Sequence, residues 1–196
     1  MRARLLEATV ELLVERGFGG TTTTLVSERA GVSRGAQLHH FPTKNALVVA
    51  AVEHLTEVRG AELAAAAQAL AAPRGTRDVL QLLADHFTSP VFTAALELWV
   101  AARTDEHLLA AVSPLELKVG REVHRLTVEL LAADETVPGV RELVQATLDL
   151  VRGLGLATTI TDDQARRAKI LDRWATTLDD TLTRTTSPTP ANRRNP

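Results

Sequence analysis

Apolar residues recur at helical spacing along almost the whole chain of 196 residues. Near the start, Leu6, Val10 and Leu13 are separated by four and three residues, which places them on one face of a helix. Gly17 is expected to end that helix near residue 16. A strand needs alternating polar and apolar residues, and only residues 21–26 approach this pattern. The chain is therefore expected to be all-α, with about nine helices.

Composition excludes several classes of protein. The sequence contains no cysteine, which rules out disulfides and thiolate metal sites. It has no run of about 18 apolar residues and no basic-then-apolar leader, so we expect a soluble cytoplasmic protein with no membrane span. The formal net charge is only -2. Any attraction to nucleic acid must therefore be local.

One stretch of the sequence is short of acidic residues. Residues 16–52 contain a single carboxylate, that of Glu28. The basic residues of this stretch are Arg16, Arg29, Arg34 and Lys44. Two neighbouring histidines add charge as the pH falls. The pattern predicts a surface that faces phosphates, with an ordinary solvated surface as the alternative.

The same stretch has the spacing of a helix-turn-helix. A short helix is predicted over residues 24–30, and Ser33 is a suitable N-cap for a second one that runs to about His40. Gly31 between them can adopt the positive φ that reverses the chain. The side chains expected to pack beneath the crossing are Val26, Val32 and Leu38. In such a motif the second helix enters the major groove of DNA.

The second short helix carries side chains that suit DNA. Arg34 can form paired hydrogen bonds to guanine or bind a phosphate, and Gln37 can pair with adenine. Ser33, His39 and His40 can reach phosphates. The four threonines at residues 21–24 also lie at the entrance of the preceding helix, where hydroxyls and backbone N–H groups favour a phosphate.

The segment from about residue 4 to residue 58 resembles the DNA-binding domain of the TetR family of bacterial transcriptional regulators. The resemblance rests on Glu15-Arg16-Gly17-Phe18, Thr22-Thr23-Thr24, Ala30-Gly31-Val32-Ser33-Arg34-Gly35 and His40-Phe41-Pro42-Thr43-Lys44. It implies a homodimer that binds a double-stranded DNA operator, and a C-terminal helical domain that binds a small-molecule inducer. The family commonly has leucine and tyrosine where this chain has Gln37 and Leu38.

Chemistry and resemblance together give the expected DNA-contacting residues. They are Thr22, Thr23, Thr24, Ser33, Arg34, Gly35, Gln37, His39, His40 and Lys44.

Three regions are predicted along the chain. Residues 1–60 form the helix-turn-helix DNA-binding domain, residues 61–186 form the helical ligand-binding and dimerisation domain, and residues 187–196 form a disordered tail. Thr43 is expected to begin a long helix. Later helix boundaries are expected at Ser89-Pro90, Ser113-Pro114, Pro138-Gly139 and Asp162-Asp163.

The C-terminal region contains a few large, polar-capable side chains on otherwise apolar helices. Such sparse polar groups in an apolar wall are typical of a ligand pocket, although ordinary core packing is the alternative. The residues predicted to bind the inducer are Phe92, Trp99, Arg103, Arg121 and His124.

Residues 140–157 are apolar over much of the helix circumference, which indicates either deep burial or a partner helix. Gly153 and Gly155 lower helix stability unless a close backbone approach compensates. With the last helix, this segment predicts a four-helix dimer interface, with packing inside one chain as the alternative. The interface residues predicted are Val144, Leu148, Val151, Gly155, Trp174 and Leu178.

Other functions receive little support from the sequence. Residues 31–35 match the Gly-x-Ser-x-Gly pattern of hydrolases, but that motif follows a strand, whereas the residues before it indicate a helix. The six histidines form no metal-binding pattern, and we expect no metal, no cofactor and no enzymatic activity. The resemblance to the TetR family implies a repressor released from its operator by a small-molecule inducer. The alternative is an all-α scaffold or enzyme that does not bind DNA.

Overall fold

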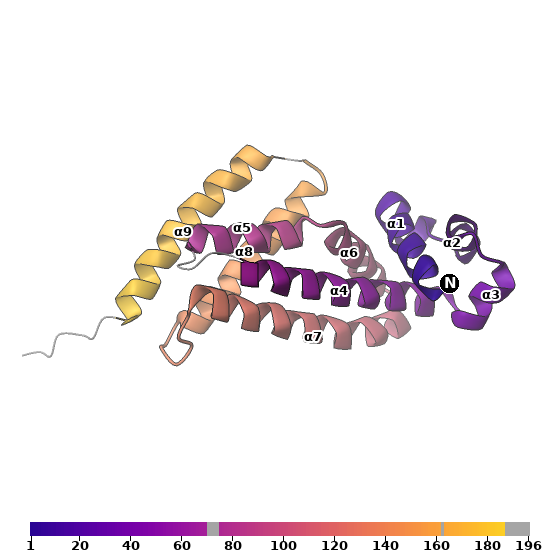
Figure 1. Cartoon of the computed structure of the whole chain (residues 1–196), viewed down its shortest axis with the longest axis horizontal. Helices are drawn as coiled ribbons and strands as arrows, with labels where there is room; N and C mark the ends of the chain where they lie inside the picture. Colours follow the sequence, from indigo (N-terminus) through magenta and orange to yellow (C-terminus); the bar gives the residue numbers. More distant parts are fainter. Residues whose placement is uncertain (70–74, 162, 187–196) are drawn as a thin grey trace, which may run out of the picture.

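A computed structural model describes residues 1–69, 75–161 and 163–186. Within these ranges the chain is all-α, as predicted, with nine helices and no strand (Figure 1). The helices are α1 (Arg2–Gly20), α2 (Thr23–Ala30), α3 (Arg34–His40), α4 (Lys44–Ala69), α5 (Thr76–Phe87), α6 (Pro90–Ala102), α7 (Glu106–Leu131), α8 (Val140–Thr158) and α9 (Gln164–Thr186). None of these described helices is both long and apolar enough to cross a bilayer. Asp162 and the predicted tail over residues 187–196 lie outside the described residues.

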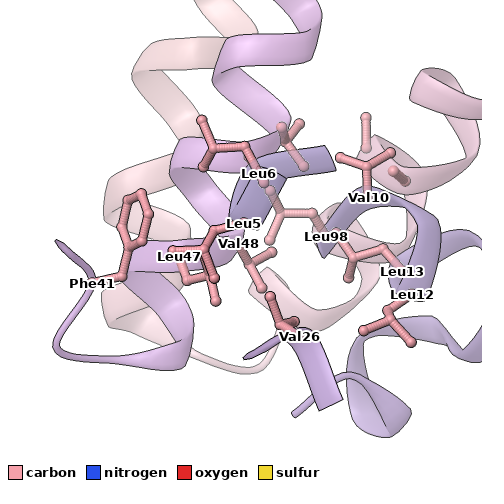
Figure 2. Packing of buried hydrophobic residues seen from close by; sticks show 14 of the residues in the cluster. Leu5, Leu6, Val10, Leu12, Leu13, Val26, Phe41, Leu47, Val48 and Leu98 are labelled. Atoms are coloured by element: carbon pink, nitrogen blue, oxygen red, sulfur yellow. The ribbon is translucent and has the colours of Figure 1, made fainter. Parts of the chain in front are cut away.

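Helices α1 to α3 and the start of α4 form one end of the molecule, which we call the head. Figure 1 shows α2 and α3 at this end and α9 at the opposite end. The apolar face of α1 supplies Leu5, Leu6 and Leu13, which are fully buried. They belong to one cluster with Val26 of α2 and Leu47 of α4 (Figure 2). Burial of this face holds the two short helices on the longer ones.

Helix α1 bends where the sequence predicts its end. Gly17 has φ 66° and ψ 177°, which interrupts the helical backbone before a last turn through Gly20. A left-handed φ of this kind favours glycine. The space beside Gly17 is also restricted, because a Cβ atom there would lie 2.7 Å from Oε2 of Glu97.

Helix α4 connects the head to the rest of the molecule, which we call the body. Thr43 caps its first turn, as predicted, because the Thr43 hydroxyl accepts a hydrogen bond of 3.1 Å from the Ala46 N–H. The helix then continues through residue 60 as far as Ala69. The boundary predicted after residue 60 therefore falls inside one continuous helix, which the alanines at 64–67 help to propagate.

Most later boundaries agree with the sequence. Ser89 caps α6 by accepting from the Phe92 N–H at 3.3 Å, and Gly139 precedes α8 with φ 89°. Asp163 caps the first turn of α9, accepting from the Arg166 N–H at 2.9 Å.

The boundary predicted at Ser113-Pro114 is wrong, because Pro114 lies inside α7. Proline removes one hydrogen bond from a helix and leaves the carbonyl four residues earlier unpaired. Ser113, Pro114 and Ala110 are all exposed, so that carbonyl lies on the water-facing side. A helix tolerates proline more easily where solvent can replace the lost bond.

Helices α5, α8 and α9 pack around a second cluster in the body. Val144 and Val151 of α8 and Leu178 of α9 are fully buried within the single chain, and Leu148 is 6% exposed. The prediction that these residues form a dimer interface is therefore wrong, since no surface remains for a partner. Trp174 is half-buried, and its indole N–H donates to the Thr147 hydroxyl at 3.0 Å.

Gly155 is also wrongly assigned to a dimer interface, because it is buried against α5. A Cβ atom at Gly155 would lie 2.1 Å from the carbonyl oxygen of Phe87. This is the close backbone approach that the sequence requires if a glycine is to be favourable there. At Gly153, by contrast, a Cβ atom would meet nothing within 4 Å.

We expect Gly155→Ala to destabilise the protein by about 1–3 kcal/mol, because α8 must move away from the backbone of α5. Gly153→Ala is the matched control on the same helix. It should leave stability unchanged or raise it by up to about 1 kcal/mol through better helix propensity. Urea unfolding of the three proteins tests this expectation, and equal stabilities for the two variants would contradict it.

Candidate nucleic-acid interface and ligand cavity

Local hydrogen bonds fix the crossing of α2 and α3. The Thr22 hydroxyl accepts from the Leu25 N–H at 3.2 Å and caps α2. Gly31 ends α2 with φ 62° and ψ 40°, the left-handed conformation predicted for it. The Ser33 hydroxyl then accepts from the Ala36 N–H at 3.2 Å and caps α3, again as predicted. The sequence thus specifies both ends of the turn.

The inner face of α3 differs from the prediction. Val26 is fully buried beneath the crossing and Val32 packs against the same cluster, but Leu38 is 45% exposed. Gln37 is completely buried, and its amide nitrogen donates to the Phe41 carbonyl at 2.7 Å. The prediction that Gln37 contacts a base is therefore wrong, as is the prediction that Leu38 packs beneath the helices.

The outer face of α3 consists of Ser33, Arg34, Gly35, Leu38 and His39, all of which are exposed. No described residue forms a hydrogen bond or ion pair with the Arg34 guanidinium, so it is available to an external partner. Gly35 has open space around its Cα, which allows another molecule to approach the backbone closely.

The three predicted threonines are not equivalent. Thr22 and Thr24 are exposed at the start of α2, whereas Thr23 is half-buried. The Thr23 carbonyl accepts from the Ser27 hydroxyl at 2.9 Å, which ties this residue to its own helix. Thr22 and Thr24 are therefore the better placed to meet a phosphate.

Lys44 is directed into the protein. Its Nζ donates to the Phe18 carbonyl at 2.5 Å and lies 4.0 Å from the centre of the Phe18 ring. Burial lowers the pKa of its ammonium group. The other backbone group of Phe18, its N–H, donates to Oε2 of Glu97 at 3.1 Å. Lys44 therefore stabilises the bend of α1. Its side chain is only partly buried and keeps two further N–H donors, so its predicted contact with DNA stays a prediction.

His40 also turns partly inward. It is half-buried, and its Nε2 atom is buried with no hydrogen-bond partner among the described residues. Its ring packs between those of His39 and Phe41, with centroid distances of 5.6 and 6.4 Å. Of the two predicted histidines, the exposed His39 is therefore the one that faces solvent.

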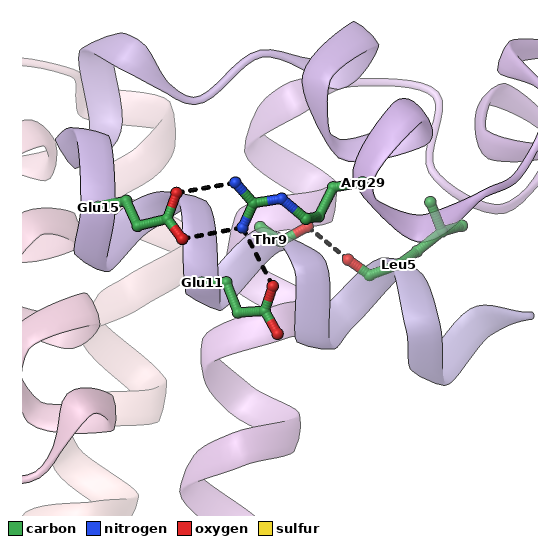
Figure 3. A network of polar contacts seen from close by, with 5 residues as sticks. All are labelled: Leu5, Thr9, Glu11, Glu15 and Arg29. Carbon is green, nitrogen blue, oxygen red and sulfur yellow. Dashed lines mark hydrogen bonds and ion pairs between the residues drawn. The ribbon is translucent and has the colours of Figure 1, made fainter.

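Arg29 is neutralised by acidic residues from outside the acid-poor stretch. Its guanidinium forms two hydrogen bonds with Glu15, at 2.9 and 2.8 Å, and one with Glu11 at 3.2 Å (Figure 3). The hydrogen bond to Glu15 and then that to Glu11 raise the pKa of Arg29, and Arg29 lowers the pKa of Glu15. The folded head is consequently less basic around Arg29 than its sequence indicates.

The body contains two adjoining cavities. The larger, of about 280 Å³, lies among α4, α5 and α7, and the smaller, of about 70 Å³, extends beneath α6 and α8. They share Thr56, His86, Val119 and Val123 in their walls. Phe87, Phe92 and Trp99 line the smaller one and stack edge to face, with centroid distances of 5.4 and 5.8 Å. Together they form an aromatic wall.

The sequence identified this cavity only in part. Phe92 and Trp99 line it, but Arg103 and Arg121 are exposed and do not. His124 instead forms a hydrogen bond of 2.7 Å with Glu135. The structure therefore places none of the three in the walls of these cavities. Arg103 and Arg121 face water although neighbouring turns are buried, and the partly buried His124 is turned toward Glu135.

The carboxylate and the guanidinium group that line the smaller cavity belong to residues that were not predicted from the sequence. They are Glu116 of α7 and Arg152 of α8. Arg152 lies 5.3 Å above the Phe87 ring and donates to Asp149 at 2.8 Å. Isolated charged residues on amphipathic helices give no signal in the sequence, so only the packing of the helices reveals them.

Several known proteins are similar to this chain. Residues 5–51 match the family of bacterial regulatory proteins named after TetR. The HTH-type transcriptional regulator Rv2912c of Mycobacterium tuberculosis is 30% identical over 167 residues, which cover 78% of this chain and 82% of that protein. The chain belongs to the TetR family.

Further comparisons with known proteins agree with this assignment. The HTH-type regulator CymR of Pseudomonas putida is 38% identical over 112 residues, although the chain spans only 53% of that protein. The fold matches a transcriptional regulator from Pseudomonas aeruginosa PAO1 with a TM-score of 0.70, 24% identity and coverage of 95% and 93% of the two chains. The multidrug binding protein EbrR matches with a TM-score of 0.62, 26% identity and coverage of 98% and 97%.

We predict a pH-dependent effect of Glu116. Burial raises the pKa of its carboxyl, and the Trp99 indole and the Arg152 charge oppose this only in part. The folded protein therefore holds this proton more tightly than the unfolded chain, so stability falls as the pH rises from the ordinary glutamate range through the raised pKa. Glu116→Gln should melt higher than the wild type near neutral pH, and this advantage should shrink in acid. An equal difference in melting temperature at both pH values would contradict the assignment.

Proposed function

We propose that this TetR-family regulator is a dimeric repressor that a small molecule releases from its operator. The observation that carries the DNA-binding part is the outer face of α3, on which Arg34 is exposed and unpaired among the described residues. An arginine at the start of a recognition helix can form two hydrogen bonds with guanine or bind a phosphate. Residues 1–60 supply the DNA-binding surface, and residues 61–186 supply the dimer contacts and most of the ligand cavity, whose wall also includes Thr56 of α4.

The other residues that we propose to contact DNA are exposed residues near Arg34 and at the start of α2. Ser33 and His39 flank Arg34 and Leu38 on α3, and Thr22 and Thr24 lie at the start of α2. Hydroxyl and imidazole groups can donate to phosphate oxygens and fix the register on the duplex. Gln37 takes no part, since its side chain is completely buried and an internal hydrogen bond holds it.

The homodimer is proposed through the outer faces of α8 and α9. These faces form an open groove in which Leu150, Ile170 and Trp174 lie beside basic residues of α9. Leu156 and Ile160 nearby are 50% and 89% exposed, which is costly for a surface that stays in water. A two-fold axis there would present two α3 helices to half-sites about 34–36 Å apart, if these lie one turn apart.

We expect Arg34→Ala to abolish specific operator binding while the fold is preserved, because Arg34 has no described internal partner to lose. Each good bidentate base contact contributes about 1–3 kcal/mol of discrimination. A mobility shift with DNA from upstream of the encoding gene, across a salt series, measures this. Arg121→Ala, an exposed arginine of the body, is the matched control and should bind as the wild type does.

The same assay tests the dimer. An operator with two half-sites should bind two chains, and removal of one half-site should weaken binding sharply.

Unchanged operator affinity of Arg34→Ala would refute the assignment of α3. Failure of the wild type to retain any fragment at low salt would favour a scaffold without DNA binding.

The two adjoining cavities in the body together form the proposed inducer site. Among proteins of the same fold, EbrR has been crystallised with proflavin and with ethidium, and FadR of Bacillus subtilis with stearoyl-CoA. In this chain Trp99 lines the cavity, and Glu97, two residues earlier on α6, holds the Phe18 N–H of α1. A ligand that displaces α6 therefore alters the support of the head. Coupling of about 1–3 kcal/mol suffices for a 5- to 150-fold change in DNA affinity.

Thermal shift against a library of apolar and aromatic compounds tests this site. We expect at least one compound to raise the melting temperature of the wild type by about 5–10 °C at saturating concentration. Trp99→Ala should lose this response, whereas Arg34→Ala should keep it. Absence of any response in the wild type, together with an equally unresponsive Trp99→Ala, would count heavily against the inducer cavity.

A further inference from the structure

Leu38 is an unusual residue for the surface of the head. The leucines at 5, 6, 12, 13 and 47 are at most 1% exposed, yet Leu38 is 45% exposed in the middle of α3. It lies one turn after Arg34, so the two side chains share a face of the helix. Figure 1 places α3 at the end of the molecule farthest from α9, where a duplex has free access.

The exposure of Leu38 is imposed by its neighbour. Gln37 is completely buried, and its amide donates to the Phe41 carbonyl at the end of the same helix. Residues adjacent on a helix point about 100° apart, so the inward position of Gln37 forces Leu38 outward. The helix thus has a polar side chain inside and an apolar one outside, the reverse of what burial alone would favour.

We propose that Leu38 packs against the C5-methyl group of a thymine in the major groove. This inference rests on the proposed function of α3. Phosphates, sugars and most base edges are polar, and the thymine methyl is the apolar group that the major groove of unmodified DNA displays. Side chains one helical turn apart are separated by about 5–6 Å, and neighbouring base pairs by about 3.4 Å. The thymine therefore lies one or two base pairs from the position that Arg34 contacts.

The test removes only the methyl group. Once the operator is defined by footprinting, each thymine of a half-site is replaced in turn by deoxyuridine, with the symmetric position changed as well. The wild type should lose about 10- to 20-fold in affinity at one position, as expected for two buried methyl groups, one in each half-site. Leu38→Ala should bind the thymine and uracil operators equally well, whereas Leu38→Met should retain the preference for thymine.

Two controls separate the possible failures. Leu109→Ala removes another exposed leucine, 48% exposed on α7, and should bind like the wild type with the same sensitivity to uracil. Circular dichroism of Leu38→Ala checks that the fold is intact. The inference is overturned if specific binding by the wild type is indifferent to every uracil, or if Leu38→Ala keeps the same sensitivity. Loss of the proposed function has a different signature, namely unchanged operator affinity of Arg34→Ala.

Discussion

Leu98 of α6 lies in the same buried cluster as Leu5 and Leu13 of α1 and Val48 of α4 (Figure 2). The head therefore has no separate core, because its first helix buries its apolar face against helices of both the head and the body. Dense packing of this kind transmits a displacement and does not absorb it. The orientation of α3 consequently depends on where α6 lies, although α3 lies at the far end of the head (Figure 1).

Two hydrogen bonds at the bend of α1 also connect the head to α6 and α4. At the bend of α1 the two backbone groups of Phe18 are held from opposite sides, the N–H by Glu97 and the carbonyl by Lys44. Gly17 supplies the left-handed backbone that exposes both groups. Since Glu97 belongs to α6 and Trp99 on that helix lines the cavity, the wall of the cavity and the support of the head are parts of one rigid element.

Local chemistry made much of this fold predictable. Thr22, Ser33 and Gly31 determine the ends of α2 and α3 through caps and a positive φ, and the sequence indicates all three. Local chemistry did not predict which neighbour each apolar helix face packs against. An apolar row such as Val144, Leu148 and Val151 fits a partner chain or an intrachain neighbour equally well, and the close approach of α5 decides between them. The cavity's charged groups likewise become neighbours only after α6, α7 and α8 pack.

The exposed charges of the head could also not be predicted from the sequence alone. A count along the sequence treats Arg29 and Lys44 as free cations, but carboxylates of α1 surround the first and a backbone carbonyl holds the second. On α3 itself Arg34 is the one arginine or lysine, and it lies on the outer face. A surface with one strong cation beside a leucine has little to gain from the phosphates alone, and its shape is better suited to the edges of particular bases. The outer face of α3 is therefore better suited to selectivity than to general attraction to DNA, which agrees with the weak overall charge of the chain.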